Sequence, residues 1–185
     1  DMSTALQALR MQSRIQIAAN QTWNISNANT NTSPSGGFNN GEDLSFDAVA
    51  VGAAFNLGGN TVDVIGGGAV TITSGFTLSN GTFNISNPNF TVQGGSNRTA
   101  AIDATMTFNV NAGGRLHFQA NSGGVTTAAA INLNGGTLTF CSNSTTVAVA
   151  QSGNINVLAA STIAVSKSNT NNDSTGALNF TGGLT

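Results

Sequence analysis

The chain has 185 residues, a formal net charge of −2 and 6% charged residues, against about 25% in ordinary globular domains. Its 39% hydrophobic content is unlike that of disordered chains, which combine few apolar residues with high net charge. The five basic residues are scattered and no apolar run reaches the length of a membrane span, which argues against a nucleic-acid footprint and against a transmembrane segment.

Residues 1–14 differ from the rest of the chain. Apolar residues from Met2 to Leu9 fall at helical spacing, and Ser3 or Thr4 could serve as an N-cap. We predict a short N-terminal helix that covers the open end of the fold, with an irregular part of a preceding coil as the alternative. No secretory signal peptide is visible and the first residue is Asp1, so we interpret the chain as mature or as a fragment.

From Ile15 onward apolar and polar residues alternate, which is the pattern of strands with one buried face. An apolar-Asn-apolar triplet recurs along the chain. Its central residues are Asn24, Asn56, Asn84, Asn109, Asn132, Asn156 and Asn179. Subtracting these positions gives steps of 32, 28, 25, 23, 24 and 23 residues. A repeat of about 20–50 residues indicates a solenoid or a related array.

The clearest copy of the repeat runs from Ile131 to Phe140. It consists of a short strand, a corner at Gly135-Gly136 and a second strand, and a less regular third strand follows in several copies. We therefore predict an all-β protein, a right-handed parallel β-helix of about 23–25 residues per coil with three short strands in each coil. The dipeptide Asn80-Gly81 lies between two short strands, so a β-sandwich built from hairpins is the alternative.

Two polar stretches interrupt this pattern. We interpret Asn27 to Asp43 and Lys167 to Gly176 as loops that project from corners, because insertions in solenoids collect in loops. The last residues, Leu184 and Thr185, fall inside a predicted strand. We expect residues 15–185 to form a single β-solenoid domain that is part of a longer chain or assembly.

The acidic residues do not form an obvious catalytic pair. Glycoside hydrolysis needs two carboxyl groups about 5–10 Å apart. Asp63 is predicted to point outward, followed in the same column by Thr91, His117, Thr139 and Ala164, without a second acid. Glu42, Asp43 and Asp47 are close in sequence, and we interpret them as part of a solvated loop, with Ca²⁺ ligation as the alternative.

His117 and Cys141 are each the only residue of their type. His117 lies between two inward residues, so we expect it on the surface, without the partners of a triad or a zinc site. Cys141 follows an inward Phe140, so we expect it to point outward or lie in a corner and to be inert. We predict no catalytic residues, no metal site and no cofactor.

The asparagine of the triplet is the strongest candidate for a shared role. Its apolar neighbours should point inward, so seven asparagines would line one outer face about 4.8 Å apart. Stacked amides hydrogen-bond along such a stack. We interpret this Asn ladder as structural, with a flat polar face for sugars or for a neighbouring solenoid as the alternative. The Thr-x-Thr pairs would favour ice binding only in one register, and we assign them to different strands; the pairs are Thr71/Thr73, Thr105/Thr107 and Thr137/Thr139.

Three stretches resemble a known family of repeats. These are Gly153-Asn154-Ile155-Asn156-Val157, Ser161-Thr162-Ile163-Ala164-Val165 and Gly176-Ala177-Leu178-Asn179-Phe180-Thr181-Gly182. They resemble the β-helical repeats associated with autotransporter passenger domains and other giant bacterial surface proteins. The resemblance implies secreted, non-catalytic stalks or adhesive fibres at the bacterial cell surface.

These observations predict a stiff structural or adhesive segment of a secreted bacterial surface protein or extracellular fibre. Its expected partners are other copies of itself, through end-to-end or lateral association, and surface glycans. A carbohydrate-binding or carbohydrate-active β-helix, of the polysaccharide lyase or phage tail-spike type, is the first alternative. An ice- or surface-binding solenoid is the second.

Overall fold

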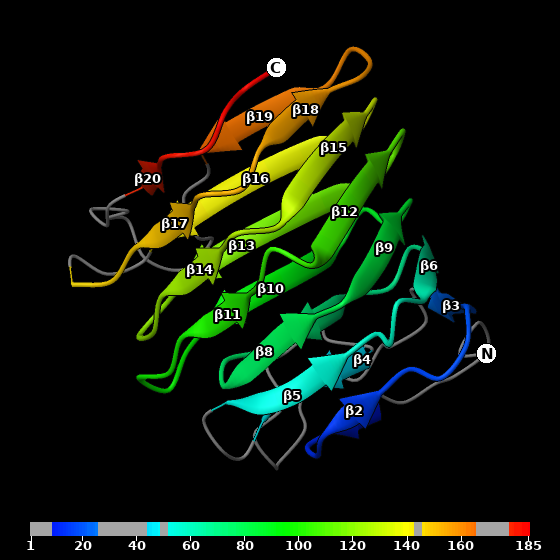
Figure 1. The fold of residues 1–185 in the computed structure, drawn as a ribbon, viewed down its shortest axis with the longest axis vertical. Coiled ribbons are helices and arrows are strands. Elements are labelled where there is room, and N and C mark those ends of the chain that lie inside the picture. The colour runs from blue at the N-terminus through cyan, green and yellow to red at the C-terminus, as the bar shows by residue number, and fades with distance from the viewer. Residues whose placement is uncertain (1–8, 26–43, 49–51, 143–145, 166–177) are drawn as a thin grey trace.

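In a computed structural model, the chain winds into three parallel β-sheets that surround a single apolar interior (Figure 1). The structure describes residues 9–25, 44–48, 52–142, 146–165 and 178–185. Within these residues every regular element is a β-strand. Each coil contributes one strand to each sheet in turn, so every strand pairs with its equivalents one coil before and one coil after.

The three sheets, here called A, B and C, have six, seven and seven strands. Sheet A contains β3 (Gln21–Ile25), β6 (Thr61–Gly66), β9 (Gly81–Ile85), β12 (Met106–Asn111), β15 (Ala130–Asn134) and β18 (Ile155–Val157). Sheet B contains β1 (Leu9–Met11), β4 (Leu44–Phe46), β7 (Val70–Ile72), β10 (Phe90–Gly94), β13 (Arg115–Ala120), β16 (Thr137–Ser142) and β19 (Thr162–Val165). Sheet C contains β2 (Ile15–Gln16), β5 (Ala53–Asn56), β8 (Phe76–Ser79), β11 (Ala100–Ile102), β14 (Val125–Thr127), β17 (Val149–Gln151) and β20 (Leu178–Phe180).

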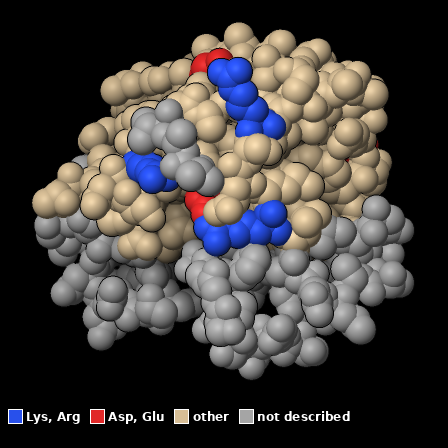
Figure 2. Space-filling view, turned by 90° about the horizontal axis from the view of Figure 1, so that it is seen from below, with Lys and Arg blue, Asp and Glu red and all other residues tan. Residues whose placement is uncertain are grey.

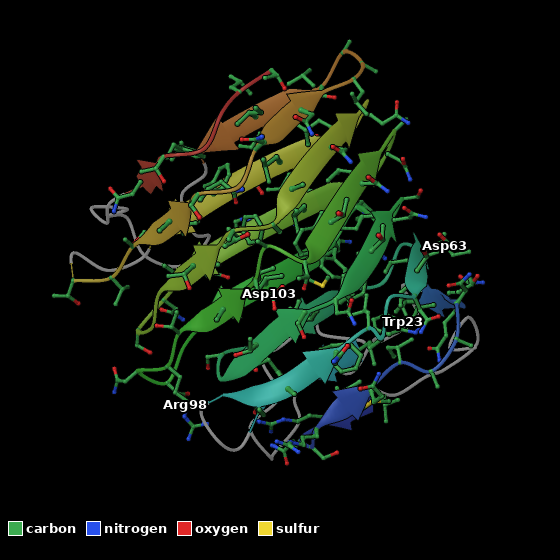
Figure 3. All side chains as sticks on the ribbon, viewed as in Figure 1. Trp23, Asp63, Arg98 and Asp103 are labelled. Atoms are coloured by element: carbon green, nitrogen blue, oxygen red, sulfur yellow. The ribbon has the colours of Figure 1, made fainter. Side chains whose placement is uncertain are left out.

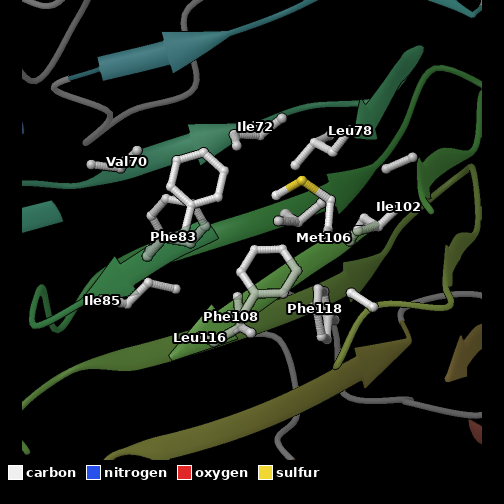
Figure 4. Packing of buried hydrophobic residues seen from close by; sticks show 14 of the residues in the cluster. Val70, Ile72, Leu78, Phe83, Ile85, Ile102, Met106, Phe108, Leu116 and Phe118 are labelled. Carbon is white, nitrogen blue, oxygen red and sulfur yellow. The ribbon is translucent and has the colours of Figure 1, made fainter. Parts of the chain in front are cut away.

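Strict alternation explains why these segments are strands. In β12 and β13 every second side chain is buried and the residues between are partly exposed. The parallel register then places identical residues of adjacent coils next to each other, since Phe83 lies beside Phe108 and Phe118 beside Phe140. The buried side chains of all three sheets form one continuous cluster (Figure 4). The interior is therefore a stack of apolar layers that gains its stability from burial.

Aromatic rings make up much of this stack. The Phe83 and Phe108 rings are stacked, with centroids 5.9 Å apart and an interplanar angle of 9°. Phe108 then meets Phe118 edge to face at 6.1 Å. Towards the first coils Trp23 continues the series, stacked on Phe46 at 5.2 Å. Offset and edge-to-face contacts of this kind add to the stabilisation from burial.

The corners depend on glycine for two separate reasons. Gly135 has φ +85°, a conformation that side chains rarely adopt. At Gly136 a Cβ atom would lie 2.6 Å from Val110 Cγ1 and 2.7 Å from the Val110 carbonyl oxygen, so there is no room for one. Asn80, with φ 59°, makes another corner: the strands on either side, β8 and β9, belong to different sheets. The Asn80-Gly81 dipeptide therefore does not form a hairpin, and the sandwich alternative is wrong.

The predicted parallel β-helix with three strands per coil is confirmed, and two details need correction. Along sheet A the hydrogen-bonded outward side chains are 21, 25, 23 and 24 residues apart, so one coil is shorter than predicted. Leu9 lies in strand β1, which pairs with β4, so this end of the predicted N-terminal helix is a strand. The rest of that helix, up to residue 8, and both predicted loops lie outside the described residues.

Charged groups are sparse on the molecule. Figure 2 shows the Lys, Arg, Asp and Glu side chains as small patches on a largely uncharged surface. The sequence has no Asp, Glu, Lys or Arg between Arg115 and Lys167. The later coils therefore depend on neutral side chains for their outer faces.

Candidate functional site: an asparagine ladder

Four of the predicted asparagines stack on the outer face of sheet A. Asn84, Asn109, Asn132 and Asn156 are the middle outward residues of β9, β12, β15 and β18, and each lies in register with the next. Asn109 Nδ2 donates to Asn84 Oδ1 at 2.8 Å, Asn132 Nδ2 to Asn109 Oδ1 at 2.8 Å, and Asn156 Nδ2 to Asn132 Oδ1 at 2.7 Å. These amides form a hydrogen-bonded ladder parallel to the solenoid axis.

The ladder has a direction. Every amide donates towards the preceding coil, and the series ends where Asn84 Nδ2 donates to Asp63 Oδ1 at 2.7 Å (Asp63 is labelled in Figure 3). At the other end Thr185 Oγ1 donates to Asn156 Oδ1 at 2.9 Å. An ionised carboxylate has acceptors and no donor, so Asp63 suits the one place in the column where only an acceptor is needed. The negative charge also faces the donor ends of the aligned amides.

The other three predicted ladder residues lie elsewhere. Asn24 is in sheet A, but it pairs with Ile65, and the partner of Asp63 is Thr22. Asn56 is in sheet C opposite Ser79, and its Oδ1 accepts a 2.7 Å hydrogen bond from the Gly58 amide. Asn179 is also in sheet C, beside Ala150. The expected column of seven is therefore a column of four asparagines extended by Asp63.

Two further polar columns flank the ladder on sheet A. Thr61, Thr82 and Thr107 are in register on one side. Asn111 and Asn134 are in register on the other side, and Asn111 Nδ2 reaches Ser86 Oγ at 3.4 Å. All these side chains are partly or well exposed. The outer face of sheet A is thus a grid of hydroxyl and amide groups.

Sheet C presents a different outer face. The column in the middle of this sheet reads Ala54, Thr77, Ala101, Thr126, Ala150 and Asn179. Alanine, which has no hydrogen-bonding side chain, takes every second position. Of these two faces, only that of sheet A has a hydrogen-bonding side chain in every consecutive coil of its middle column from β6 to β18.

The described carboxylates are held separately by other groups. Asp47 forms an ion pair with Arg10 and accepts a 2.8 Å hydrogen bond from Thr73 Oγ1. Asp103 accepts from the Thr105 amide at 2.8 Å and also from its hydroxyl group. Within the described ranges no group of three or more His, Cys, Asp or Glu residues could hold a metal ion. Glu42 and Asp43, the other members of the predicted acidic cluster, lie outside the described residues.

His117 is on the outer face of sheet B, in a column with Thr71, Thr91, Thr139 and Ala164. This corrects the assignment of Asp63 to the same column. The imidazole is partly buried, with Nδ1 2.7 Å from Thr139 Oγ1. Burial and the neighbouring Arg115 charge lower the pKa of His117 to about 4, although the contact with Thr139 acts in the opposite direction. His117 is therefore a neutral, packed side chain at pH 7 and not the solvated one that we expected.

Two other predictions concern sheet B. Cys141 points outward, in register with Gln119, yet it is fully buried. Thr71 and Thr139 belong to one column, contrary to our assignment, while Thr107 is on sheet A. Both Thr71 and Thr139 are buried, so this column does not offer the exposed threonine array that ice binding would need.

The fold and the ladder define a β-solenoid repeat protein. No protein-family model matches the chain, and the searches of curated proteins and of solved structures also gave no match. The described part of the chain contains no helix that is long and apolar enough to cross a membrane.

Proposed function

We propose that this chain is a stiff structural and adhesive segment of a secreted bacterial surface protein or extracellular fibre. The observation that carries the proposal is the unbroken register of three parallel sheets around one apolar stack, with an amide ladder along the outside. Such a body resists bending because every coil is bonded to both neighbours. The resemblance of Gly153–Val157 and the two stretches after it to autotransporter passenger repeats supports the bacterial surface location.

A non-catalytic role is part of this proposal. Asp47, Asp63 and Asp103 are each engaged by a different set of protein groups, which does not favour the paired carboxylates of a glycosidase. Incubation with a panel of acidic and neutral polysaccharides tests this point. We expect no released oligosaccharide, and turnover of any member of the panel would contradict a purely structural role.

End-to-end association is the form of adhesion that the two ends of the solenoid support best. At the C-terminal end Leu158, Val165 and Leu184 are 66%, 66% and 67% exposed, beside a hollow of about 240 Å³ lined partly by Phe180. At the opposite end a hollow of about 230 Å³ is lined by Trp23 among other apolar residues. Stacking a second copy head to tail would bury both surfaces and continue all three sheets, because edge strands pair readily.

Negative-stain electron microscopy and sedimentation velocity test this proposal together. We expect concentration-dependent rods from the unmodified protein and shorter, monomeric particles from the double variant Leu158→Lys/Val165→Lys. The control is Ser122→Lys/Thr126→Lys, which places the same charges at exposed lateral positions. A protein that stays monomeric at every concentration, or two double variants with equal effects, would rule out association through the ends.

A further inference from the structure

The outer face of sheet A carries a regular array of hydrogen-bonding groups. Strand spacing repeats each column about every 4.8 Å along the axis, and outward residues of one strand are about 6.6 Å apart. The threonine column, the asparagine ladder and the column of Ser86, Asn111 and Asn134 therefore form a grid that is complete over β9 and β12. Strand β6 adds Thr61 and Asp63, and on β15 Ala130 takes the place of the threonine. Figure 3 shows side chains projecting outward along these strands.

The ladder fixes the orientation of the amides and leaves part of their hydrogen-bonding capacity unused. An asparagine amide has two N–H groups and an oxygen with two lone pairs. Within the described structure Asn109 and Asn132 each spend one N–H and one lone pair on their ladder neighbours. One N–H and one lone pair of each amide remain for a ligand. Because neighbouring amides already fix the side-chain orientation, binding would require little further ordering.

The charge of this face selects the kind of partner. Strands β9, β12, β15 and β18 carry no Asp, Glu, Lys or Arg, and Asp63 is the one charged outward residue on β6. An anionic polymer would find no cation there, and a cationic polymer would find one carboxylate at one end of the grid. A neutral partner with closely spaced donors and acceptors matches the charge and the repeat of the face.

We propose that the outer face of sheet A binds a neutral, hydroxyl-rich polysaccharide that lies along the solenoid axis. This inference rests on the proposed adhesive function and names the class of its partner. Sheet C has alanine at every second position of its equivalent column, so it forms no continuous ladder of hydrogen-bonding groups. Binding therefore belongs to one side of the solenoid, which leaves the ends free for association with other copies.

Co-sedimentation with insoluble cellulose and chitin tests the proposal. The variant Thr82→Val/Thr107→Val removes two hydroxyl groups of the grid, keeps β-branched side chains and leaves the ladder untouched. The matched control is Thr77→Val/Thr126→Val, which makes the same change in one column of sheet C. We expect the unmodified protein and the control to sediment with at least one of the two polymers, and the sheet A variant to bind about tenfold more weakly.

Equal binding by the two double variants, or no binding of the unmodified protein to either polymer, would overturn the inference. Ice shaping without polysaccharide binding would also overturn it. Circular dichroism melting curves establish that each variant is folded. A folded, rod-forming protein that binds neither polymer would leave the proposed structural function in place while removing this inference.

Discussion

Asp63 and Asn132 stand in one column of sheet A but have different tasks. Asn132 accepts from Asn156 and donates to Asn109, so it needs both halves of its amide. Asp63 only accepts, from Asn84. The ladder is therefore directional. We expect aspartate to be tolerated poorly at position 132 and asparagine to be tolerated well at position 63.

The variant Asn132→Asp should destabilise the protein by about 1–3 kcal/mol, because it replaces a donor with an oxygen that faces Asn109 Oδ1. The reverse change, Asp63→Asn, keeps the acceptor for Asn84 and should cost less than about 1 kcal/mol. Urea unfolding followed by circular dichroism measures both. Similar losses in the two variants would show that the direction of the ladder does not matter.

His117 should make the stability depend on pH in the acid range. Its pKa in the folded protein is lowered from 6.5 to about 4, so the unfolded chain binds more protons between these values. Stability is therefore fully present above about pH 6.5 and falls as the pH drops towards 4. After a discount for partial exposure we expect a loss of about 2 kcal/mol.

The matched variant is His117→Thr, since threonine already occupies the positions on either side in the column. Unfolding free energies measured from pH 7 to pH 4.5 should fall less in this variant than in the unmodified protein. Parallel pH profiles for the two proteins would mean that other groups cause the acid sensitivity.

At the scale of one strand, the stability lost when an aromatic ring is removed should increase with the burial of that ring in the stack. Phe108 in β12 is fully buried between Phe83 and Phe118. Phe108→Ala should cost about 3–5 kcal/mol, as expected for a large cavity in a packed core. Phe180 in β20 is 48% exposed and contacts Phe140, so Phe180→Ala should cost much less.

Thermal and urea unfolding of both variants provide the comparison. Each variant loses the same atoms, so the difference between them reports the position in the stack and not the residue type. A loss for Phe180→Ala as large as that for Phe108→Ala would mean that the last coil is packed as tightly as the central ones.

The same strand scale explains what the sequence could predict. Alternation and a repeating triplet are enough to predict parallel coils with three strands, because each sheet hides one face in the same interior. They do not tell which sheet a strand joins. Phe55-Asn56-Leu57 has the pattern of the ladder triplet but begins in sheet C, and the true counterpart in that coil is Val62-Asp63-Val64. A carboxylate in place of the amide concealed this match.

Buried polar residues were the other feature that alternation could not reveal. Asn87 is fully buried, and the hydrogen bonds that its amide donates to the Gly66 and Gly68 carbonyls offset the cost of burying it. Gln151 takes an inward position of β17 and donates to the Ala129 and Gly153 carbonyls. The Gly66, Gly68 and Ala129 carbonyls belong to the preceding coil, and the Gly153 carbonyl lies in the corner directly after β17. Their positions depend on the path of each corner, and residue type alone does not fix that path.

At the scale of the whole molecule, the solenoid behaves as a row of coupled coils. Each coil contacts only the coils before and after it, so an end coil has half of the neighbours that a central coil has. Burial follows the same gradient. The inward residues of β12 are fully buried, whereas Leu9 in β1 and Ile163 in β19 are 41% and 42% exposed. Opening should therefore begin at the two ends and move inward.

Hydrogen exchange measured by mass spectrometry should reveal this order. Backbone amides of β9, β12 and β15 should exchange about a hundredfold more slowly than those of β1 and β19, which corresponds to a difference of about 3 kcal/mol in opening free energy. Association through the ends would change this gradient in a specific way. Protection at β1 and β19 should rise with protein concentration, while protection at β12 stays constant. Uniform exchange along the chain would show that the coils unfold as one unit, and concentration-independent exchange at β1 and β19 would argue against contacts between copies.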